Sequence, residues 1–428
     1  MVKALREEGL EATRQKVDLG YEGRRALFAS AGLNIIRRHV GSAMTSRPIE
    51  HSEAAERALL KDLVDAALGL WELNQIQKIG EGVASNIQVL GDQKIVVERN
   101  TGERFATRSV FGSVKDMQEW VRRISRTFGN GEPFDHSQPS VDLYLPGGIR
   151  YNASFEENFG CVVSLRFTNF TIESLKSLVD LGSLSPDEAA LLKACVLARL
   201  NVVVSGATNS GKTTLLRTML AETPPFETIV TIEDSQELEL DKFVGPDVTV
   251  LQMLERRANI DGHGAVSSSD LFQASLRMRP DRTLVGECRG PVVSEFLQAI
   301  NSGQDGAMTT LHATGPQAMV TRMVSCADGR ASRNAVVADI RTGLDIVVQI
   351  FRDERSGKRF LSGIYQVDSS HEQDSTVRFT DLFVGSGTSP SRFVTRPSGS
   401  VGRRLDAVGW APPVTGAPPT TAAMAGPT

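Results

Sequence analysis

The sequence lacks any run of about 18 apolar residues, the length that a helix needs to cross a bilayer. Its charged N-terminus also lacks the apolar core of a secretory signal peptide. We therefore expect no membrane span, and we expect any membrane association to be peripheral or to pass through a partner protein. The length of 428 residues is enough for two or three domains.

Cysteine is scarce as well, and the cysteines lie far apart without a C-x-x-C pair: Cys161, Cys195, Cys288 and Cys326. This spacing argues against a disulfide framework or a zinc site and suits reduced thiols in the cytoplasm. An excess of positive charge is also missing, because the formal net charge is −4. A protein that tracks along nucleic acid combines basic and aromatic residues on one surface, so no direct nucleic-acid partner is expected.

One stretch matches the phosphate-loop pattern G-x-x-x-x-G-K-[ST]: Gly206, Ala207, Thr208, Asn209, Ser210, Gly211, Lys212 and Thr213, followed by Thr214. The run 201–204 before it predicts a buried strand, and the run 215–220 after it predicts a helix, which is the context that this pattern requires. The glycines let backbone N–H groups face phosphate oxygens at the positive end of a helix. Lys212 can then reach the β- and γ-phosphates, and the Thr213 hydroxyl can hold Mg²⁺. The stretch predicts a site for ATP with Mg²⁺.

The rest of the chain is expected to divide around this loop. Strands at 201–205, 228–232, 282–286, 307–311 and 346–351 alternate with helices, which predicts an α/β fold with a parallel sheet. Residues 85–153 mix short strands with one amphipathic helix at 115–128, which predicts a smaller α+β domain. We expect a helical N-terminal arm (1–55), an α+β domain (56–170), a P-loop ATPase domain (171–385) and a disordered tail rich in Gly, Pro and Ser (386–428).

Three predicted strands end in polar residues: Glu233, Glu287 and His312. The carboxyl ends of parallel strands meet at the edge of the sheet that holds the phosphate loop, where ligands bind. Hydrolysis of a triphosphate needs a group that orients or deprotonates water, a carboxylate near the metal and a sensor of the γ-phosphate. We assign these roles to Glu233, Glu287 and His312 in that order, and the roles of the two glutamates are interchangeable at this stage.

Each assignment has a structural alternative. An acid after a strand can serve only as the N-cap of the next helix, and a histidine there can simply be hydrogen-bonded. Arginines at positions 277, 279, 282 and 289 surround the strand of Glu287 and either offset charge on the γ-phosphate or form ion pairs. The joint placement of the three residues is what favours a catalytic site.

Four blocks in this order resemble one known family: the phosphate loop, an acidic block at 231–238, the block 276–290 with Gly286-Glu287, and a histidine block at 306–313. The sequence resembles the type II/type IV secretion-system ATPase superfamily. The stretch 276–282 followed by Gly286-Glu287, together with 145–153, is most similar to its CpaF-like branch, which serves tight-adherence (Flp) pili. The likeness covers roughly residues 55–385.

The resemblance implies properties that spacing alone does not give. Members are hexameric rings with a RecA-like ATPase core, and ATP binds between that core and the N-terminal domain. They work in the cytoplasm, peripherally at the inner face of the plasma membrane, on a polytopic inner-membrane platform protein. Arg150 and Arg166 would approach the nucleotide from the N-terminal domain, or would serve as structural salt bridges. Ala207 and Asn209 depart from the glycines that are frequent in relatives, and Cys288 replaces an aliphatic residue.

The sequence therefore predicts an ATP-hydrolysing motor that powers pilus assembly or protein secretion. A conjugative or type IV secretion ATPase that moves DNA or protein is an alternative within the same class. An ATP-binding scaffold with little turnover is an alternative from another class, and the glutamate pair with His312 argues against it. A nucleic-acid motor is disfavoured by the net charge.

Overall fold

The computed structural model describes residues 21–44, 53–80, 84–99, 103–129, 134–145, 148–167, 172–256, 263–327, 331–369, 376–385 and 390–413. Within these ranges, no helix combines the length and the apolar character that crossing a membrane would require. The chain forms two compact units, one up to Asn169 and one from Phe170 onward.

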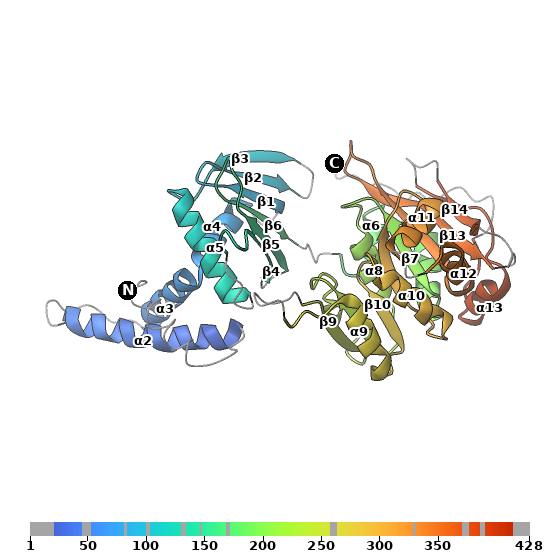
Figure 1. The fold of residues 1–428 in the computed structure, drawn as a ribbon, viewed down its shortest axis with the longest axis horizontal. Coiled ribbons are helices and arrows are strands. Elements are labelled where there is room, and N and C mark those ends of the chain that lie inside the picture. Colours follow the sequence, from blue (N-terminus) through green and yellow to red (C-terminus); the bar gives the residue numbers. More distant parts are fainter. Residues whose placement is uncertain are drawn as a thin grey trace, which may run out of the picture. The chain divides into compact units, whose positions relative to one another are not determined.

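The first unit is a six-stranded antiparallel sheet with helices (Figure 1). Its elements are α2 (Tyr21–Met44), α3 (Glu53–Leu68), α4 (Leu70–Ile79), β1 (Ala84–Leu90), β2 (Lys94–Arg99), β3 (Arg104–Arg108), α5 (Val114–Phe128), β4 (Ser140–Leu145), β5 (Ile149–Ser154) and β6 (Val162–Phe167). The strand order is β3-β2-β1-β6-β5-β4. The apolar side of α5, with Met117, Trp120, Val121 and Ile124 fully buried, packs into the core of this sheet, as its spacing predicts.

A glycine separates two consecutive helices of the first unit. Gly69 adopts a left-handed conformation (φ 84°), so α3 ends and α4 starts after it. The carbonyl oxygen of Gly69 accepts a hydrogen bond of 2.8 Å from the indole Nε1 of Trp120. A side chain at position 69 would press against Ile124, so both backbone conformation and space favour glycine. The predicted hairpin at 141–152 is present as β4 and β5, whereas Pro146 and Gly147 of its turn lie outside the described residues.

The second unit is built on a nine-stranded sheet. Its elements are α6 (Leu175–Asp180), α7 (Pro186–Leu197), β7 (Val202–Gly206), α8 (Lys212–Leu220), β8 (Thr228–Glu233), η1 (Leu240–Lys242), β9 (Thr249–Leu254), α9 (Ser268–Ser275), η2 (Leu276–Met278), β10 (Arg282–Val285), α10 (Val292–Asn301), β11 (Met308–His312), α11 (Pro316–Cys326), α12 (Arg333–Gly343), β12 (Ile346–Arg352), β13 (Arg359–Asp368), β14 (Arg378–Val384), β15 (Arg392–Phe393) and α13 (Gly399–Ala407). The strand order is β15-β14-β13-β12-β7-β11-β10-β8-β9, and β12 to β9 in this order are parallel.

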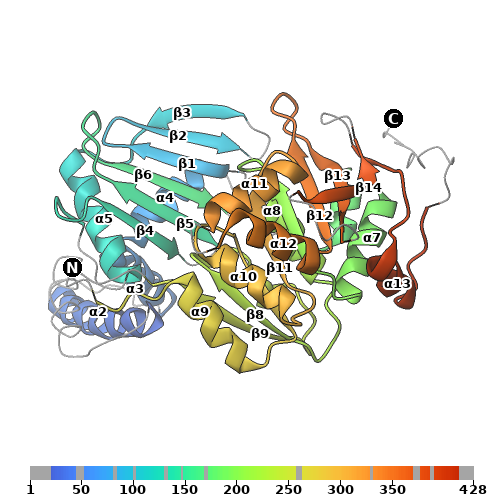
Figure 2. The same ribbon diagram turned by 45° about the vertical axis from the view of Figure 1, so that its right-hand side comes forward.

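Both faces of the parallel part are covered by helices, which explains why the strands from β12 to β8 are almost wholly buried, whereas the edge strand β9 is partly exposed. One face packs with α7 and α8, and the other packs with α9 to α12, of which α10, α11 and α12 are on the near side in Figure 2. The predicted strands and helices of this unit agree with the structure to within a few residues, although β9 and α6 were not predicted. The α/β fold class, with a smaller N-terminal domain, is confirmed.

The prediction of a disordered tail from residue 386 is wrong for the part of the tail that the structure describes. Residues 390–413 form β15 and α13 and pack on the second unit. Val401, Leu405 and Trp410 are buried in the same apolar core as α7 and β7. These few apolar side chains bury enough surface to hold a segment whose composition is otherwise that of a disordered chain.

Candidate functional site

The strand order places the predicted site residues next to one another. β7, β11, β10 and β8 are consecutive in the sheet, and they end at or just before Gly206, His312, Glu287 and Glu233. His312 is directly opposite Gly206 in the parallel register of β11 and β7. The backbone N–H of Gly286 donates to the carbonyl of Ile232, which holds the end of β10 beside Glu233. Three of these strands therefore deliver a polar side chain to the edge at which β7 leads into the phosphate loop.

The phosphate loop connects β7 to α8, and its first glycine has no space for a side chain. A Cβ atom at position 206 would lie 2.6 Å from both the Ile350 carbonyl oxygen and the Ser210 Oγ, so glycine is required there. Gly211 has φ 99° and Asn209 has φ 62°, which turns the loop into the first residue of α8. Asparagine tolerates this conformation better than most residues, so the departure from glycine at 209 fits the observed backbone.

Lys212 lies over this loop and is almost fully buried. Its ammonium donates to the carbonyl oxygens of Gly206 (3.2 Å) and Ala207 (2.9 Å) and lies 3.1 Å from Nδ1 of His312. The same Nδ1 is 3.4 Å from the Thr208 hydroxyl. Burial and the adjacent Lys212 charge lower the pKa of His312, which keeps the ring neutral at physiological pH. A neutral ring can accept from Lys212 through Nδ1.

Glu287 continues this chain of contacts. Its carboxylate lies 3.2 Å from Nε2 of His312 and accepts from Arg289 at 2.5 Å, and Arg289 also contacts Asp234 at 3.4 Å. Burial acts to raise the pKa of Glu287, but the hydrogen bond and charge of Arg289 outweigh it, so the net shift is downward. Glu287 is therefore ionised and suited to a cation.

Glu233 has a different environment. It is 3% exposed, and one carboxyl oxygen accepts the backbone N–H groups of Glu237 (3.0 Å) and Leu238 (2.9 Å). Burial raises its pKa to about 7, although both hydrogen bonds act to lower it. The two carboxyl groups at the ends of adjacent strands thus have pKa values displaced in opposite directions, the arrangement expected of an acid–base site.

The remaining residues that the sequence predicts to bind the nucleotide lie partly in the phosphate loop of the second unit and partly on strands of the first unit. Thr213 and Thr214 are in the first turn of α8, partly exposed, and Ala207, Thr208 and Asn209 form the exposed rim of the loop while Ser210 is buried. Arg150 and Arg166 are on β5 and β6 of the first unit, directly opposite each other. Their approach to the nucleotide stays a prediction of the family resemblance.

Sequence analysis left two roles open for the arginines around Glu287, and the structure gives different ones to Arg282 and Arg289. Arg282 lies at the amino end of β10, where its fully buried guanidinium pairs with Glu227, so it belongs to the opposite edge of the sheet. Arg289 does belong to the site, and its spacing of two residues from Glu287 was a usable signal. Arg359 donates to the carbonyl of Asn209 at 3.4 Å from far along the chain, which no local pattern predicts.

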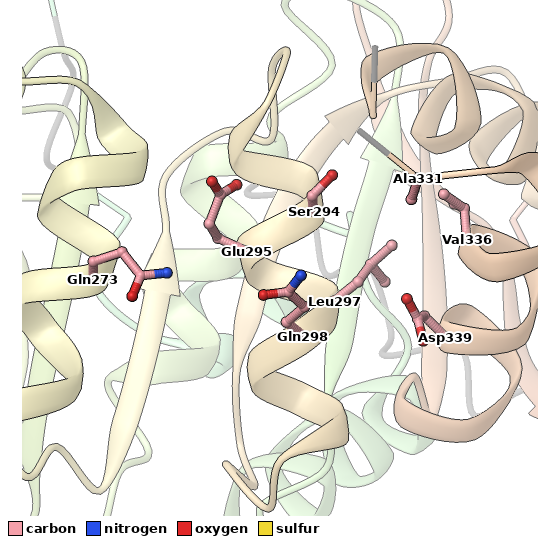
Figure 3. A pocket seen from close by; sticks show the side chains of 8 residues that line it. All are labelled: Gln273, Ser294, Glu295, Leu297, Gln298, Ala331, Val336 and Asp339. Atoms are coloured by element: carbon pink, nitrogen blue, oxygen red, sulfur yellow. The ribbon is translucent and has the colours of Figure 1, made fainter. Parts of the chain in front are cut away.

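Apart from the phosphate-loop site, a polar cavity of about 160 Å³ lies between α9, α10 and α12 (Figure 3). Its lining residues are Gln273, Ser294, Glu295, Leu297, Gln298, Ala331, Val336 and Asp339. It shares no residue with the phosphate-loop site.

Comparison with known proteins identifies the family. Residues 149–376 match the model of the type II/IV secretion system protein family. The chain belongs to this family. It is 35% identical over 255 residues to a putative conjugal transfer protein of Mycobacterium tuberculosis, covering 57% of this chain and 71% of that protein. It is 36% identical over 167 residues to the protein VirB11 of Agrobacterium tumefaciens, covering 38% of this chain and 47% of that one.

The fold is shared with a solved structure. The Legionella pneumophila ATPase DotB superimposes with a TM-score of 0.51 at 22% identity, over 70% of this chain and 81% of that one. This likeness concerns the fold, which is an N-terminal domain followed by a RecA-like core. Family membership makes this chain a secretion-system ATPase that binds nucleotide.

Proposed function

We propose that this secretion-system ATPase is a motor that powers pilus assembly or protein secretion through an inner-membrane platform protein. The observation that carries the proposal is the contact chain Lys212–His312–Glu287, with Glu233 at the end of the adjacent strand β8 on the same edge of the sheet. Perturbed pKa values gather at functional sites, and burial raises the pKa of Glu233 to about 7, which favours a catalytic site over a scaffold that only binds ATP.

Each residue has a proposed role. The phosphate loop from Gly206 to Thr214 would hold the phosphates, with Lys212 neutralising their charge. Glu233 would accept the proton of the attacking water, because a base is most effective when its pKa lies near the working pH. His312 would sense the γ-phosphate through the Lys212 contact that it makes here. The pKa difference between the two glutamates favours Glu233 over Glu287 as the base.

The site fits a divalent cation. Thr213 and the ionised Glu287 would hold Mg²⁺, which when bound supplies positive charge to the phosphates. The carboxylate of Glu287 has acceptor sites for both the cation and Arg289, so the Arg289 contact can persist beside the metal. Arg150 and Arg166 would add charge at the nucleotide, as the family resemblance implies.

The kind of secretion system is the finer part of the proposal. The CpaF-like blocks at 276–290 and 145–153 favour a tight-adherence pilus, with a hexameric ring at the cytoplasmic face of the membrane. The names of the relatives favour a second candidate, a conjugative or type IV secretion ATPase. Both candidates share the motor, and they differ in the partner protein.

The first test measures steady-state ATPase activity together with mass in solution, with and without ATP and Mg²⁺. We expect turnover to rise as the protein assembles into a hexamer. A monomer that binds ATP and stays inactive even with its platform protein would overturn the motor proposal in favour of a scaffold. Stimulation by pilus-type or by conjugation-type platform protein separates the two candidates.

A further inference from the structure

A buried polar side chain interrupts an apolar strand next to the phosphate loop. Gln349 is 6% exposed in the middle of β12, between Val348 and Ile350. A buried amide is costly unless its hydrogen bonds are satisfied, so its partners indicate why it is there.

The two ends of this amide contact two different parts of the site. Its Oε1 accepts a hydrogen bond from the hydroxyl of Ser205, and its Nε2 donates to the carbonyl oxygen of Ala313 at 3.1 Å. Ser205 directly precedes the first glycine of the phosphate loop, and Ala313 directly follows His312. β7 lies between β12 and β11 in the sheet, so the side chain links the strands on either side of it.

We propose that Gln349 is a positioning residue for ATP hydrolysis, which fixes the segment after His312 relative to the phosphate loop. β7 itself is held by ladder hydrogen bonds on both sides, and these do not need the side chain of Gln349. Ala313, in contrast, lies beyond the end of β11, where the ladder no longer holds the chain. The inference rests on the ATPase function proposed above and deepens it.

The consequence for catalysis follows from the contacts of His312. The His312 ring meets Lys212 and Glu287 at 3.1 and 3.2 Å, so a small displacement of the segment after it breaks both contacts. Nucleotide binding by the loop depends less on this segment. Loss of the amide is therefore expected to lower turnover more than affinity.

The chain contains a matched control in the adjacent strand. Gln366 on β13 is 7% exposed, and its amide also donates once and accepts once, to the carbonyl and from the N–H of Ser398. Ser398 is the N-cap of α13, so Gln366 ties the C-terminal segment to the sheet. The two glutamines match in burial and hydrogen bonding and differ in what they hold.

The experiment compares Gln349→Met and Gln366→Met in the full chain, since methionine keeps the length and removes both hydrogen bonds. The kcat and KM for ATP, the Kd for ADP and Tm are measured for each. Both variants are expected to lose a similar amount in Tm. For Gln349→Met, kcat should fall by roughly tenfold or more while the Kd for ADP changes by less than about threefold. For Gln366→Met, kcat should stay near that of the wild type.

Other outcomes would overturn the role of Gln349. These are an unchanged kcat in Gln349→Met, an equal fall in both variants, and a loss of ADP binding that matches the loss of kcat. If Gln349→Met does not fold, Gln349→Asn serves instead, because its amide is one methylene too short to reach both partners. A wild-type protein that stays without turnover even with its platform protein would instead refute the proposed function, and the role of Gln349 with it.

Discussion

At the scale of single residues, the burial of Glu233 disfavours the ionised form of its carboxyl group. The folded protein holds its proton more tightly than the unfolded chain does, because burial raises the pKa from 4.5 to about 7. Its contribution to stability is therefore complete below about pH 4.5 and is lost as the pH rises through about 7. At about 1.4 kcal/mol per pH unit over this interval, the ionised carboxylate costs the fold up to about 3 kcal/mol.

Glu233→Gln is expected to retain ATP binding and to lose hydrolysis, because an amide can accept the two backbone N–H groups but cannot accept a proton. The same substitution should raise Tm at pH 8 and leave it nearly unchanged at pH 5. Thermal melts of the nucleotide-free protein at both pH values, with ATP titration and turnover, check this. Normal turnover in Glu233→Gln would show that another group activates the water.

The pH profile of the wild type gives an independent measurement. If Glu233 is the base in the free enzyme, kcat/KM should rise with pH through an apparent pKa of about 7, because only the ionised carboxylate accepts a proton. His312 would give a rising limb at lower pH, since its pKa is lowered. A profile that is flat between pH 6 and 8 would contradict the assignment.

Lys212→Ala is expected to abolish nucleotide binding or turnover. The substitution removes the ammonium that lies over the loop carbonyls and beside His312. Lys193→Ala is the matched control, because Lys193 makes a surface ion pair with Glu222 on the same unit. Titration with a fluorescent ADP analogue distinguishes lost binding from lost chemistry, and unchanged values for both would remove Lys212 from the site.

At the scale of elements, the C-terminal helix α13 acts as part of the ATPase core. Arg404 donates to the carbonyls of Ala198 and Arg199 after α7 and contacts Asp345 before β12. Leu405 is fully buried beside it. Because these contacts lie before the amino ends of β7 and β12, α13 stabilises the core of the second unit at the edge of the sheet opposite the phosphate loop.

Leu405→Ala should therefore destabilise the protein by about 2–5 kcal/mol, the usual range for a buried leucine. Arg403→Ala, at an exposed position of the same helix, should change the free energy of unfolding by less than about 0.5 kcal/mol. Urea unfolding of both variants measures the difference. Equal effects would mean that α13 is docked too weakly to stabilise the core of the second unit.

What the sequence predicts well and what it misses have a common physical cause. The strands of the second unit and the polar residues at their ends are local patterns, so Glu233, Glu287 and His312 could be found from the chain alone. Gln349 could not, because its partners Ser205 and Ala313 become neighbours only through strand order. The tail was predicted to be disordered because its composition is rich in Gly, Pro and Ser, and a short buried helix changes that composition little. The four-residue spacing of Val401 and Leu405 was its one helical signal.

At the scale of the whole molecule, the question is how the two units share the chemistry. Arg150 and Arg166 are opposite each other on antiparallel strands of the first unit, so both side chains leave the same face of the sheet. The family resemblance implies that both side chains approach the nucleotide, and substitution of one of them tests this.

Arg150→Ala is therefore expected to lower kcat by about a hundredfold, the usual effect of removing one group that stabilises developing charge. Its Tm should change little, because the ladder hydrogen bonds of β5 do not depend on this side chain. Arg104→Ala is the control, since Arg104 lies on β3 of the same sheet and pairs with Glu98 at the surface. A fall in Tm with unchanged kcat would instead make Arg150 a structural residue, and the first unit would then contribute no charge to hydrolysis through it.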